Sequence, residues 1–473
     1  MNAQTGKLSM LEKVSYGFGD LASVLYWQTF MLYFTYFYTD VFLIPASAAA
    51  TMFLVSRIWD GVNDPIMGII ADRTRTRWGK FRPYLLWLCV PFAVIGVLTF
   101  TVPDFGMTGK LIWAYVTFIL IMMLYTAINI PYTALLGVIS PNSAERTDVS
   151  SIKFLFAFGA GIIVSATLLP MVKTLGAGNT AQGWQYSFMI YGAAAIVFFL
   201  IAFKGTKERV QPPKTQKSSV KKDLYELVTN GPWLILLATT ITFILFVATK
   251  SSVTVHYFKY VIGSQDLKLP FLSPGTYDFE TLTSAYNTIG QISSFIGVLL
   301  VSWFARQVGK KRAFLIIFVV AIFSTGMVFL LSAKHLVWIF LLQILGSLTG
   351  GPLSVLLWAM YADTADYAEW KRGRRATGLV FSASTMSQKF GWAFGAFVAL
   401  NLMSQVGFAP NTAQSAESLR GLIALFSIIP AGLGIGALVL AFFYPLNDKK
   451  VKKITDDLSA RRKERGEDVE GYE

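Results

Sequence analysis

The chain has 473 residues, of which 54% are hydrophobic, 15% aromatic and only 14% charged, whereas an ordinary soluble domain carries about 25% charged residues. A soluble fold of this length cannot bury so much apolar surface, and the same apolar content excludes a disordered chain. The single cysteine, Cys89, excludes a disulfide-stabilised scaffold. We therefore expect an all-α integral membrane protein.

Apolar runs close to the ~20 residues that a bilayer crossing requires recur along the whole chain. We expect twelve transmembrane helices at 15–38, 44–71, 83–103, 111–138, 150–173, 185–203, 232–262, 281–304, 313–332, 337–362, 377–403 and 420–445. Residues 1–14 are polar and lack a signal-peptide cleavage site, so the first span is expected to serve as its own membrane signal.

The formal net charge of +14 follows the membrane topology. Most Lys and Arg residues lie in every second connection, chiefly in 72–82, 204–222, 305–313, 370–375 and the tail from residue 446. This pattern predicts that these segments and both termini face the cytoplasm, as in a protein of the bacterial inner membrane. The lipid bilayer is therefore the expected partner of the chain, and nucleic acid is not.

The longest polar break inside the membrane portion divides the spans six and six. We expect an N-terminal six-helix bundle at 1–203, a cytoplasmic linker at 204–231, a second six-helix bundle at 232–445 and a charged cytoplasmic tail at 446–473. A weak similarity between the basic runs that follow spans two and eight indicates that the two halves of the chain are related. Two repeated bundles around a central cavity form the major-facilitator fold.

Span two carries ionisable residues where they are costly, and such residues indicate function. Asp60 and Asp64 are four residues apart and therefore share one face of the helix, with Asn63 beside them. Two close carboxylates favour either a bound proton or a bound cation, and oxygen ligands suit Na⁺, Li⁺ or H⁺. The alternative is a set of salt bridges, for example to Arg57 or to a lysine on another helix.

Other polar residues within the spans are candidates for binding a substrate. For Asp20 and Lys389, we favour a substrate or coupling role over a structural ion pair. Lys153 lies at the start of span five. Asn129 can either contact the substrate or hold two helices together. Trp358 can stack on a sugar or face lipid.

The cytoplasmic end of span ten carries acids followed by bases, which can form an inner gate. The acids are Asp363, Asp366 and Glu369, and the bases include Arg374 and Arg375. A solvated charged loop is the alternative.

These motifs resemble a known transporter family. The segments that carry the resemblance are Tyr16–Asp20, Tyr38–Asp40, Arg57–Gly68, Arg77–Phe81 and Ala362–Tyr367. They resemble the glycoside–pentoside–hexuronide:cation symporter family, over nearly the whole chain. The resemblance implies a major-facilitator fold and the uptake of a sugar or glycoside driven by Na⁺, Li⁺ or H⁺.

The resemblance also implies roles for individual residues. Asp60, Asn63 and Asp64 match the family's cation ligands on span two, and Thr126 matches its hydroxyl on span four. The presence of all four favours Na⁺ as the coupling ion. Lys389 matches a lysine that lies beside the cation and sugar sites.

The sugar site departs from the family pattern. The span-one acid is replaced by Val24, with Asp20 one turn earlier, and the span-four acid is replaced by Asn129. With Lys153 and Lys389 kept, an anionic sugar such as a hexuronide becomes easier to accommodate.

Three alternatives remain open from the sequence: a proton-coupled sugar symporter, a transporter of lysolipids or other amphiphiles, and a sensor that binds sugar without moving it. An enzyme is not expected, because two histidines, His256 and His335, and one cysteine form no catalytic constellation. For the same reason we expect no resident cofactor.

Overall fold

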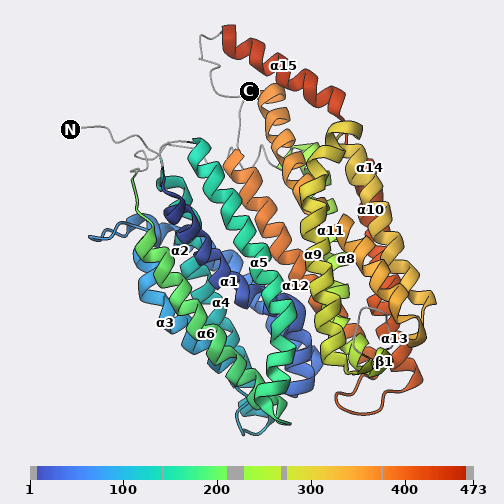
Figure 1. Cartoon of the computed structure of the whole chain (residues 1–473). Coiled ribbons are helices and arrows are strands. Elements are labelled where there is room, and N and C mark those ends of the chain that lie inside the picture. Colours follow the sequence, from blue (N-terminus) through green and yellow to red (C-terminus); the bar gives the residue numbers. More distant parts are fainter. Residues whose placement is uncertain (1–7, 141–142, 210–227, 268–273, 374–376, 465–473) are drawn as a thin grey trace. The chain divides into compact units, whose positions relative to one another are not determined.

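The computed structural model describes residues 8–140, 143–209, 228–267, 274–373 and 377–464, and these are mostly helical (Figure 1). The helices are α1 (Met10–Tyr36), α2 (Ala46–Arg73), α3 (Arg82–Thr99), α4 (Met107–Val138), α5 (Ser143–Gly176), α6 (Thr180–Gly205), α8 (Gly231–His256), α9 (Phe279–Val308), α10 (Lys310–Met327), α11 (Leu336–Arg372), α12 (Thr377–Gln405), α13 (Ala416–Phe426), α14 (Ile428–Phe442) and α15 (Asp448–Glu464).

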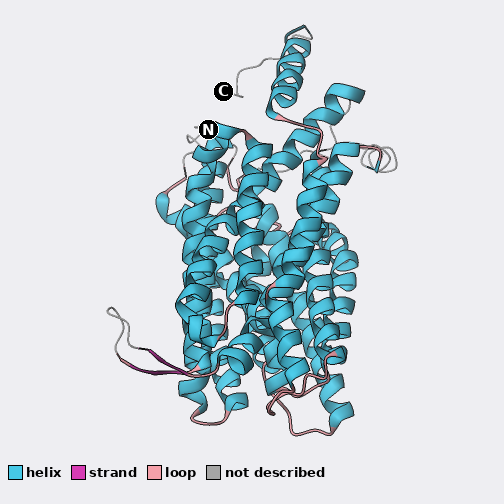
Figure 2. Ribbon diagram, turned by 90° about the vertical axis from the view of Figure 1, so that its right-hand side faces the viewer, coloured by secondary structure: helices cyan, strands magenta, loops and turns pink. Residues whose placement is uncertain are grey.

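Shorter elements extend or connect these helices (Figure 2). They are the π-helical turns η1 (Phe37–Val41) and η2 (Tyr257–Ile262), the 3₁₀ turns η3 (Val328–Leu330) and η4 (Ala333–His335), and the strands β1 (Gln265–Leu267) and β2 (Gly275–Tyr277). The two strands pair antiparallel, with Gln265 opposite Tyr277.

Among the described residues, nine helical stretches are long and apolar enough to cross a membrane. Helices α1, α2 and α12 complete the twelve spans expected from the sequence. These three carry Asp20, the Asp60–Asp64 pair and Lys389, whereas Thr126, Asn129 and Lys153 lie in helices of the apolar set. The helical content and the spans confirm the predicted all-α membrane fold.

The last span is interrupted, which the apolar run at 420–445 did not predict. Helix α13 ends at Phe426, α14 begins at Ile428, and Ser427 between them departs from helical geometry. Pro430 has no N–H to donate to the carbonyl of Phe426, so one helical hydrogen bond is missing at this point. The hydroxyl of Ser427 donates to the carbonyl of Ile423 instead.

The chain forms two compact units, in each of which long helices run alongside one another. The first comprises Met1–Thr215, Ser251–Gln291 and Ala396–Leu422. Within it α1 packs against α5 and α6, α3 against α4 and α6, and α2 against α4. Gly96 lets α3 approach α1 closely, because a Cβ at this position would lie 2.2 Å from the ring of Tyr26.

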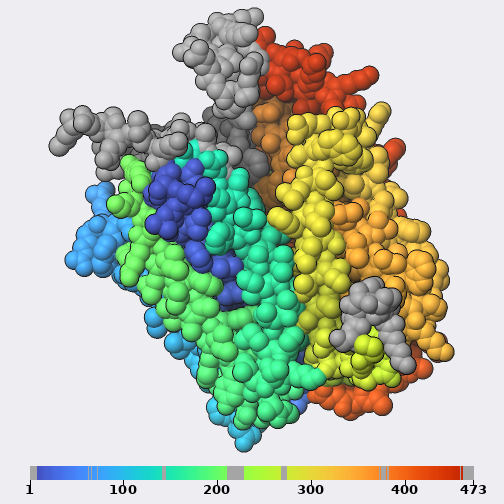
Figure 3. Space-filling view, viewed as in Figure 1, coloured from blue at the N-terminus to red at the C-terminus, as the bar shows by residue number. Residues whose placement is uncertain are grey.

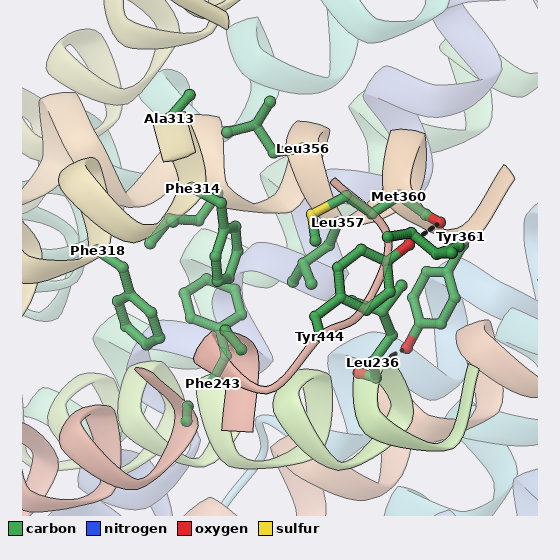
Figure 4. Packing of buried hydrophobic residues seen from close by; sticks show 14 of the residues in the cluster. Leu236, Phe243, Ala313, Phe314, Phe318, Leu356, Leu357, Met360, Tyr361 and Tyr444 are labelled. Carbon is green, nitrogen blue, oxygen red and sulfur yellow. Dashed lines mark hydrogen bonds between the residues drawn. The ribbon is translucent and has the colours of Figure 1, made fainter. Parts of the chain in front are cut away.

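The second unit comprises Gln216–Lys250, Ile292–Gly395 and Ile423–Glu473. Here α10 packs against α11 and α14, and α15 packs against α11. Its apolar core joins Phe243, Phe314 and Phe318 with residues of α11 (Figure 4). Two tyrosines tie this core to the backbone: the hydroxyl of Tyr361 donates to the carbonyl of Leu236 at 3.2 Å, and that of Tyr444 to the carbonyl of Met360 at 3.2 Å.

Helices α3 and α10 begin in the same way, each inside its own unit. Gly79 and Gly309 precede them with φ of 107° and 91°, a backbone conformation that favours glycine. The N–H groups of residues 80–82 donate to the carboxylate of Glu208 at 2.9, 2.8 and 3.0 Å, and the first N–H of α10 donates to Asp448 at 2.9 Å. The weak similarity between the two basic runs therefore corresponds to a shared structural feature. In each half, an acidic residue that follows the last span caps the helix that begins in the basic run.

Candidate functional site

The contact between α2 and α4 contains two of the four residues predicted to bind a cation. Oγ1 of Thr126 donates to Oδ1 of Asp64 at 3.0 Å, which joins the two helices through side-chain oxygens. Thr126 is buried, and Asn63 and Asp64 are half-buried. The four-residue spacing places Asp60 and Asp64 on one face of α2. The structure thus brings Asp64 and Thr126 into direct contact.

Asp60 makes the salt bridge that the sequence left open as an alternative. Nη1 of Arg57 lies 2.9 Å from Oδ2 of Asp60, and both side chains are at most 1% exposed. The guanidinium of Arg57 also lies over the rings of Trp27 and Phe53, 4.8 Å from each centroid, and such contacts stabilise a desolvated cation. The two acids of span two therefore have different surroundings: Asp60 forms a salt bridge with Arg57, and Asp64 accepts a hydrogen bond from Thr126.

Two predicted substrate residues form one ion pair. Nζ of Lys153 on α5 lies 3.7 Å from Oδ1 of Asp20 on α1, and the two side chains are 20% and 13% exposed. Lys153 also lies over the ring of Tyr132, 5.7 Å from its centroid. Tyr132 and Tyr16 stack and exchange hydrogen bonds, each hydroxyl donating to the other residue's carbonyl at 3.0 and 2.8 Å. This pair joins α1 to α4 next to Asp20.

Asn129 makes a hydrogen bond within its own helix in this structure. Its Nδ2 donates to the carbonyl of Tyr125 at 2.9 Å, one turn earlier on α4. The ring of Tyr125 stacks on Trp27, with centroids 5.3 Å apart, and Trp27 is one of the two rings that contact Arg57. Asn129 is half-buried.

The remaining predicted substrate residues belong to the second unit. Trp358 on α11 is half-buried, packs against the apolar core and lies 6.1 Å from the ring of Tyr361. Lys389 on α12 is also half-buried. Both are therefore held by helices rather than by loops.

The predicted inner gate is described only in part. Asp363 accepts two hydrogen bonds from Nζ of Lys310 on α10, at 2.6 and 2.5 Å, so its partner comes from a helix of the same unit. Asp366 and Glu369 are half-buried on the last turns of α11. The basic side of the predicted gate, Arg374 and Arg375, lies outside the described residues.

The profile of the family described as "MFS/sugar transport protein" matches residues 15–448. The chain belongs to this family. It is 35% identical over 464 residues to the putative glycoside/cation symporter YagG of Escherichia coli strain K12, covering 98% of both chains. It is 38% identical over 459 residues to the isoprimeverose transporter of Lactiplantibacillus pentosus, covering 95% of this chain and 91% of that one. These matches confirm the resemblance that the motifs indicate.

Solved structures with the same fold are more distant in sequence. A chain from a study of proton-dependent oligopeptide transporters superposes with a TM-score of 0.65 at 12% identity, covering 95% of this chain and all of that one. The nucleoside transporter NupG superposes with a TM-score of 0.59 at 13% identity, covering 92% of this chain and 98% of that one. Together with the family match, these likenesses make the chain a multi-pass membrane transporter of the major facilitator superfamily, and not an enzyme.

One polar cluster of this transporter was not assigned a role from the sequence. Asp40 lies on the π-helical turn η1, at the end of α1. Its carboxylate contacts Nε2 of His256 at 2.9 Å, Nζ of Lys259 at 2.8 Å and the hydroxyl of Tyr260. Nδ2 of Asn411 donates to the backbone carbonyl of Asp40 at 2.7 Å. The cluster ties the end of α1 to the end of α8 and to the loop after α12, all within the first unit.

The sequence held a signal for this cluster. Asp40 lies two residues after the first predicted span, and His256 and Lys259 lie in the last two turns of the seventh. Both spans are predicted to end on the side opposite the basic segments. Both ends are π-helical turns, which occur frequently at functional sites. An acid and two bases at the ends of two spans on one side are compatible with a contact there, although they do not identify the partners.

A second cluster of charged residues lies at the start of α1, at the other end of this helix from Asp40. Nζ of Lys13 lies 2.8 Å from Glu145 and 2.7 Å from Asp148, and the guanidinium of Arg209 holds both carboxylate oxygens of Glu12 at 2.6 and 2.8 Å. Hydrogen bonds to Asp148 and Glu145 raise the pKa of Lys13. The hydrogen bond from Lys13 lowers the pKa of Glu145, and the one to Glu12 raises the pKa of Arg209.

Proposed function

We propose that the chain is a symporter that imports a neutral glycoside together with Na⁺ across a bacterial cytoplasmic membrane, with both termini in the cytoplasm. The family match supports sugar transport, and two relatives above 30% identity are named as a glycoside/cation symporter and an isoprimeverose transporter. The distribution of basic residues over every second connection supports the orientation.

The observation that carries the cation assignment is the contact between Asp64 and Thr126. A carboxylate and a hydroxyl from two helices already face each other at 3.0 Å, and hard cations take such oxygen ligands. When Na⁺ enters, the hydroxyl of Thr126 turns its proton away and presents a lone pair, and Asn63 offers an amide oxygen. Arg57 balances Asp60, so that Asp60 can stay charged beside the ion.

The ion pair of Asp20 and Lys153 supports a neutral glycoside as the substrate. A carboxylate accepts hydrogen bonds from sugar hydroxyls and an ammonium donates to them, so the pair at 3.7 Å offers both functions in one place. The charge of Lys153 is already balanced by Asp20, which lowers its attraction for a uronate, so the proposal departs from the anionic sugar that the sequence favoured. Asn129, Trp358 and Lys389 are the further substrate contacts in this proposal, Trp358 by stacking on a sugar ring.

Coupling follows from linkage between the two sites. Na⁺ at Asp64 neutralises a carboxylate and holds α2 against α4, which favours the arrangement that binds sugar, and the sugar favours Na⁺ by the same factor. The cluster around Asp40 holds the end of α1 to the end of α8 on the proposed outer side. On the inner side, Asp363, Asp366 and Glu369 are the acids of the proposed gate, with Asp363 paired to Lys310 in this structure, and Arg374 and Arg375 are its proposed bases.

A thermal-shift panel on purified protein tests the proposal. Neutral glycosides and glucuronides are each added with Na⁺, Li⁺ or choline at one pH, because a ligand that binds the native state raises the melting temperature. We expect a neutral glycoside to stabilise only with Na⁺ or Li⁺, and Asp64→Asn to abolish that dependence. Asp104→Asn, at an exposed loop position, is the matched control and should keep it.

Each other result points to a specific alternative. Stabilisation by glycosides in choline as well as in Na⁺ contradicts Na⁺ coupling and favours a proton symporter. Stabilisation by glucuronides alone contradicts the neutral substrate, and stabilisation by lysolipids alone favours an amphiphile transporter. A glycoside that binds but shows no counterflow in proteoliposomes identifies a sensor.

A further inference from the structure

A large cavity lies in the second unit, and none of the residues assigned to sugar or cation is among those that line it. Its volume is about 830 Å³, within the roughly 300–1,000 Å³ of small-molecule sites. The end of α9, the start of α10, the middle of α11 and the start of α15 line it. In Figure 3 the yellow surface of α9 and the start of α10 faces the viewer, with the red surface of α15 above it.

One part of the cavity lining is aliphatic. Val301, Ala305 and Val308 of α9 face it, with Val355 and Leu356 of α11. The spacing of four and three residues along α9 places its three members on one face of the helix. These side chains offer no hydrogen bonds, so this part of the cavity suits a hydrocarbon chain rather than a sugar or a nucleotide.

The other part of the lining is basic. Arg306, Lys310, Arg312 and Lys449 contribute to it from three different helices. The carboxylate among the lining residues, Asp448, accepts a hydrogen bond from the first N–H of α10 at 2.9 Å. That acid is thus engaged in capping a helix, and the side chains at this end carry an excess of positive charge, which favours an anion.

Lys310 also has a structural role, because its ammonium forms a salt bridge with the carboxylate of Asp363 at 2.5 Å. Arg306, Arg312 and Lys449 are exposed at the surface, and Nε of Arg306 donates to the carbonyl of Ser302 one turn earlier, at 3.3 Å. These three side chains are therefore the basic groups best placed to meet a ligand from outside.

The surface beside the cavity is apolar, as expected where a membrane protein meets lipid. Leu299, Leu300 and Trp303 of α9 are 65%, 52% and 64% exposed. Leu299, Trp303 and Arg306 follow one another at helical spacing, so an apolar stripe ends in a guanidinium. Tryptophan and arginine in this order are typical of the membrane–water interface.

We propose that this cavity binds an anionic phospholipid of the cytoplasmic leaflet. The phosphate contacts Arg306, Arg312 and Lys449, and the first part of an acyl chain lies against Val301 and its aliphatic neighbours. Basic pockets between transmembrane helices on the cytoplasmic side bind anionic headgroups. The aliphatic wall selects a lipid over a free phosphate.

The test measures lipid retained by the purified full-length protein. Native mass spectrometry and thermal shift are recorded with phosphatidylglycerol, with phosphatidylcholine and with the headgroup mimic glycerol 3-phosphate. The triple variant Arg306→Gln, Arg312→Gln, Lys449→Gln should reduce phosphatidylglycerol retention about tenfold or more, since each basic group near the surface contributes to anionic-lipid affinity. The double variant Arg306→Lys, Arg312→Lys keeps the charge and should retain most of the binding.

A matched control removes three positive charges from the exposed part of α15, with Lys452→Gln, Lys453→Gln, Arg461→Gln. It should change retention less than twofold. Equal loss in the control and in the cavity variant would overturn the proposal, because the effect would then be general charge. Equal retention of phosphatidylcholine would also overturn it. Saturation by glycerol 3-phosphate at the concentration that suffices for the lipid would assign the cavity to a small anion instead.

Discussion

Thr126→Val removes one oxygen from the proposed cation site and leaves the shape of the side chain nearly unchanged. In the present structure this hydroxyl donates to Asp64 at 3.0 Å in a buried contact between α2 and α4. A hydrogen bond to a charged group contributes about 1.5–3 kcal/mol, and about 1.4 kcal/mol corresponds to a factor of ten in affinity. If the same oxygen ligates Na⁺ with similar strength, its loss raises the Na⁺ half-saturation concentration by at least about tenfold.

The assay is glycoside counterflow in proteoliposomes, titrated with Na⁺ at constant pH and ionic strength. Thr117→Val is the matched control, because Thr117 is a buried threonine of the same helix whose hydroxyl donates to its own helix, to the carbonyl of Trp113 at 2.8 Å. We expect Thr117→Val to leave the Na⁺ titration within about twofold of the wild type. An unshifted titration for Thr126→Val, or equal shifts in both variants, would refute the assignment of Thr126 to the cation site.

The remaining predictions concern two ion pairs and one helix cap. Asp20→Asn and Lys153→Gln should each raise the glycoside half-saturation concentration about tenfold. The double variant should be no worse than either single variant, because all three break the same ion pair. Additive losses in sugar titrations would contradict this. The folded-state pKa of Glu145 lies below its ordinary value of 4.5, so the stability it contributes is present at neutral pH and is lost as pH falls through that lowered pKa. Melting temperatures recorded from pH 7 down to a pH below that lowered pKa should therefore fall more in the wild type than in Glu145→Gln, and parallel curves would exclude the contact with Lys13 as the cause. Asp448→Ala should lower the melting temperature by removing a helix cap, typically about 1 kcal/mol, whereas Asp456→Ala, exposed on the same helix, should not; equal effects would contradict the capping role.

The fold was the part best predicted from the sequence. Apolar runs report the length of each span directly, since the bilayer sets that length; the run at 232–262, for example, coincides with α8 and η2 to within one residue. The break at Ser427 was missed because it is a change of backbone conformation at a single residue, and a hydropathy pattern reports the length of an apolar run and not its local backbone geometry.

The candidate site was predicted at the level of helix faces and not at the level of partners. The spacing of Asp60 and Asp64 predicts one shared face, yet one acid contacts Arg57 and the other Thr126. The pairing of Asp20 with Lys153 depends on how α1 and α5 are rotated against each other. Periodicity within one helix carries no information on that rotation, and for the same reason the cluster around Asp40 was not predicted.

The most direct test of the central claim is uptake of a labelled neutral glycoside into proteoliposomes under an imposed Na⁺ gradient. The account predicts accumulation above equilibrium with an inward Na⁺ gradient, in the wild type and in Asp104→Asn, and none in Asp64→Asn. Accumulation driven equally by a proton gradient in choline, or undiminished Na⁺-driven accumulation in Asp64→Asn, would contradict the claim that Na⁺ binds at Asp64 and drives transport.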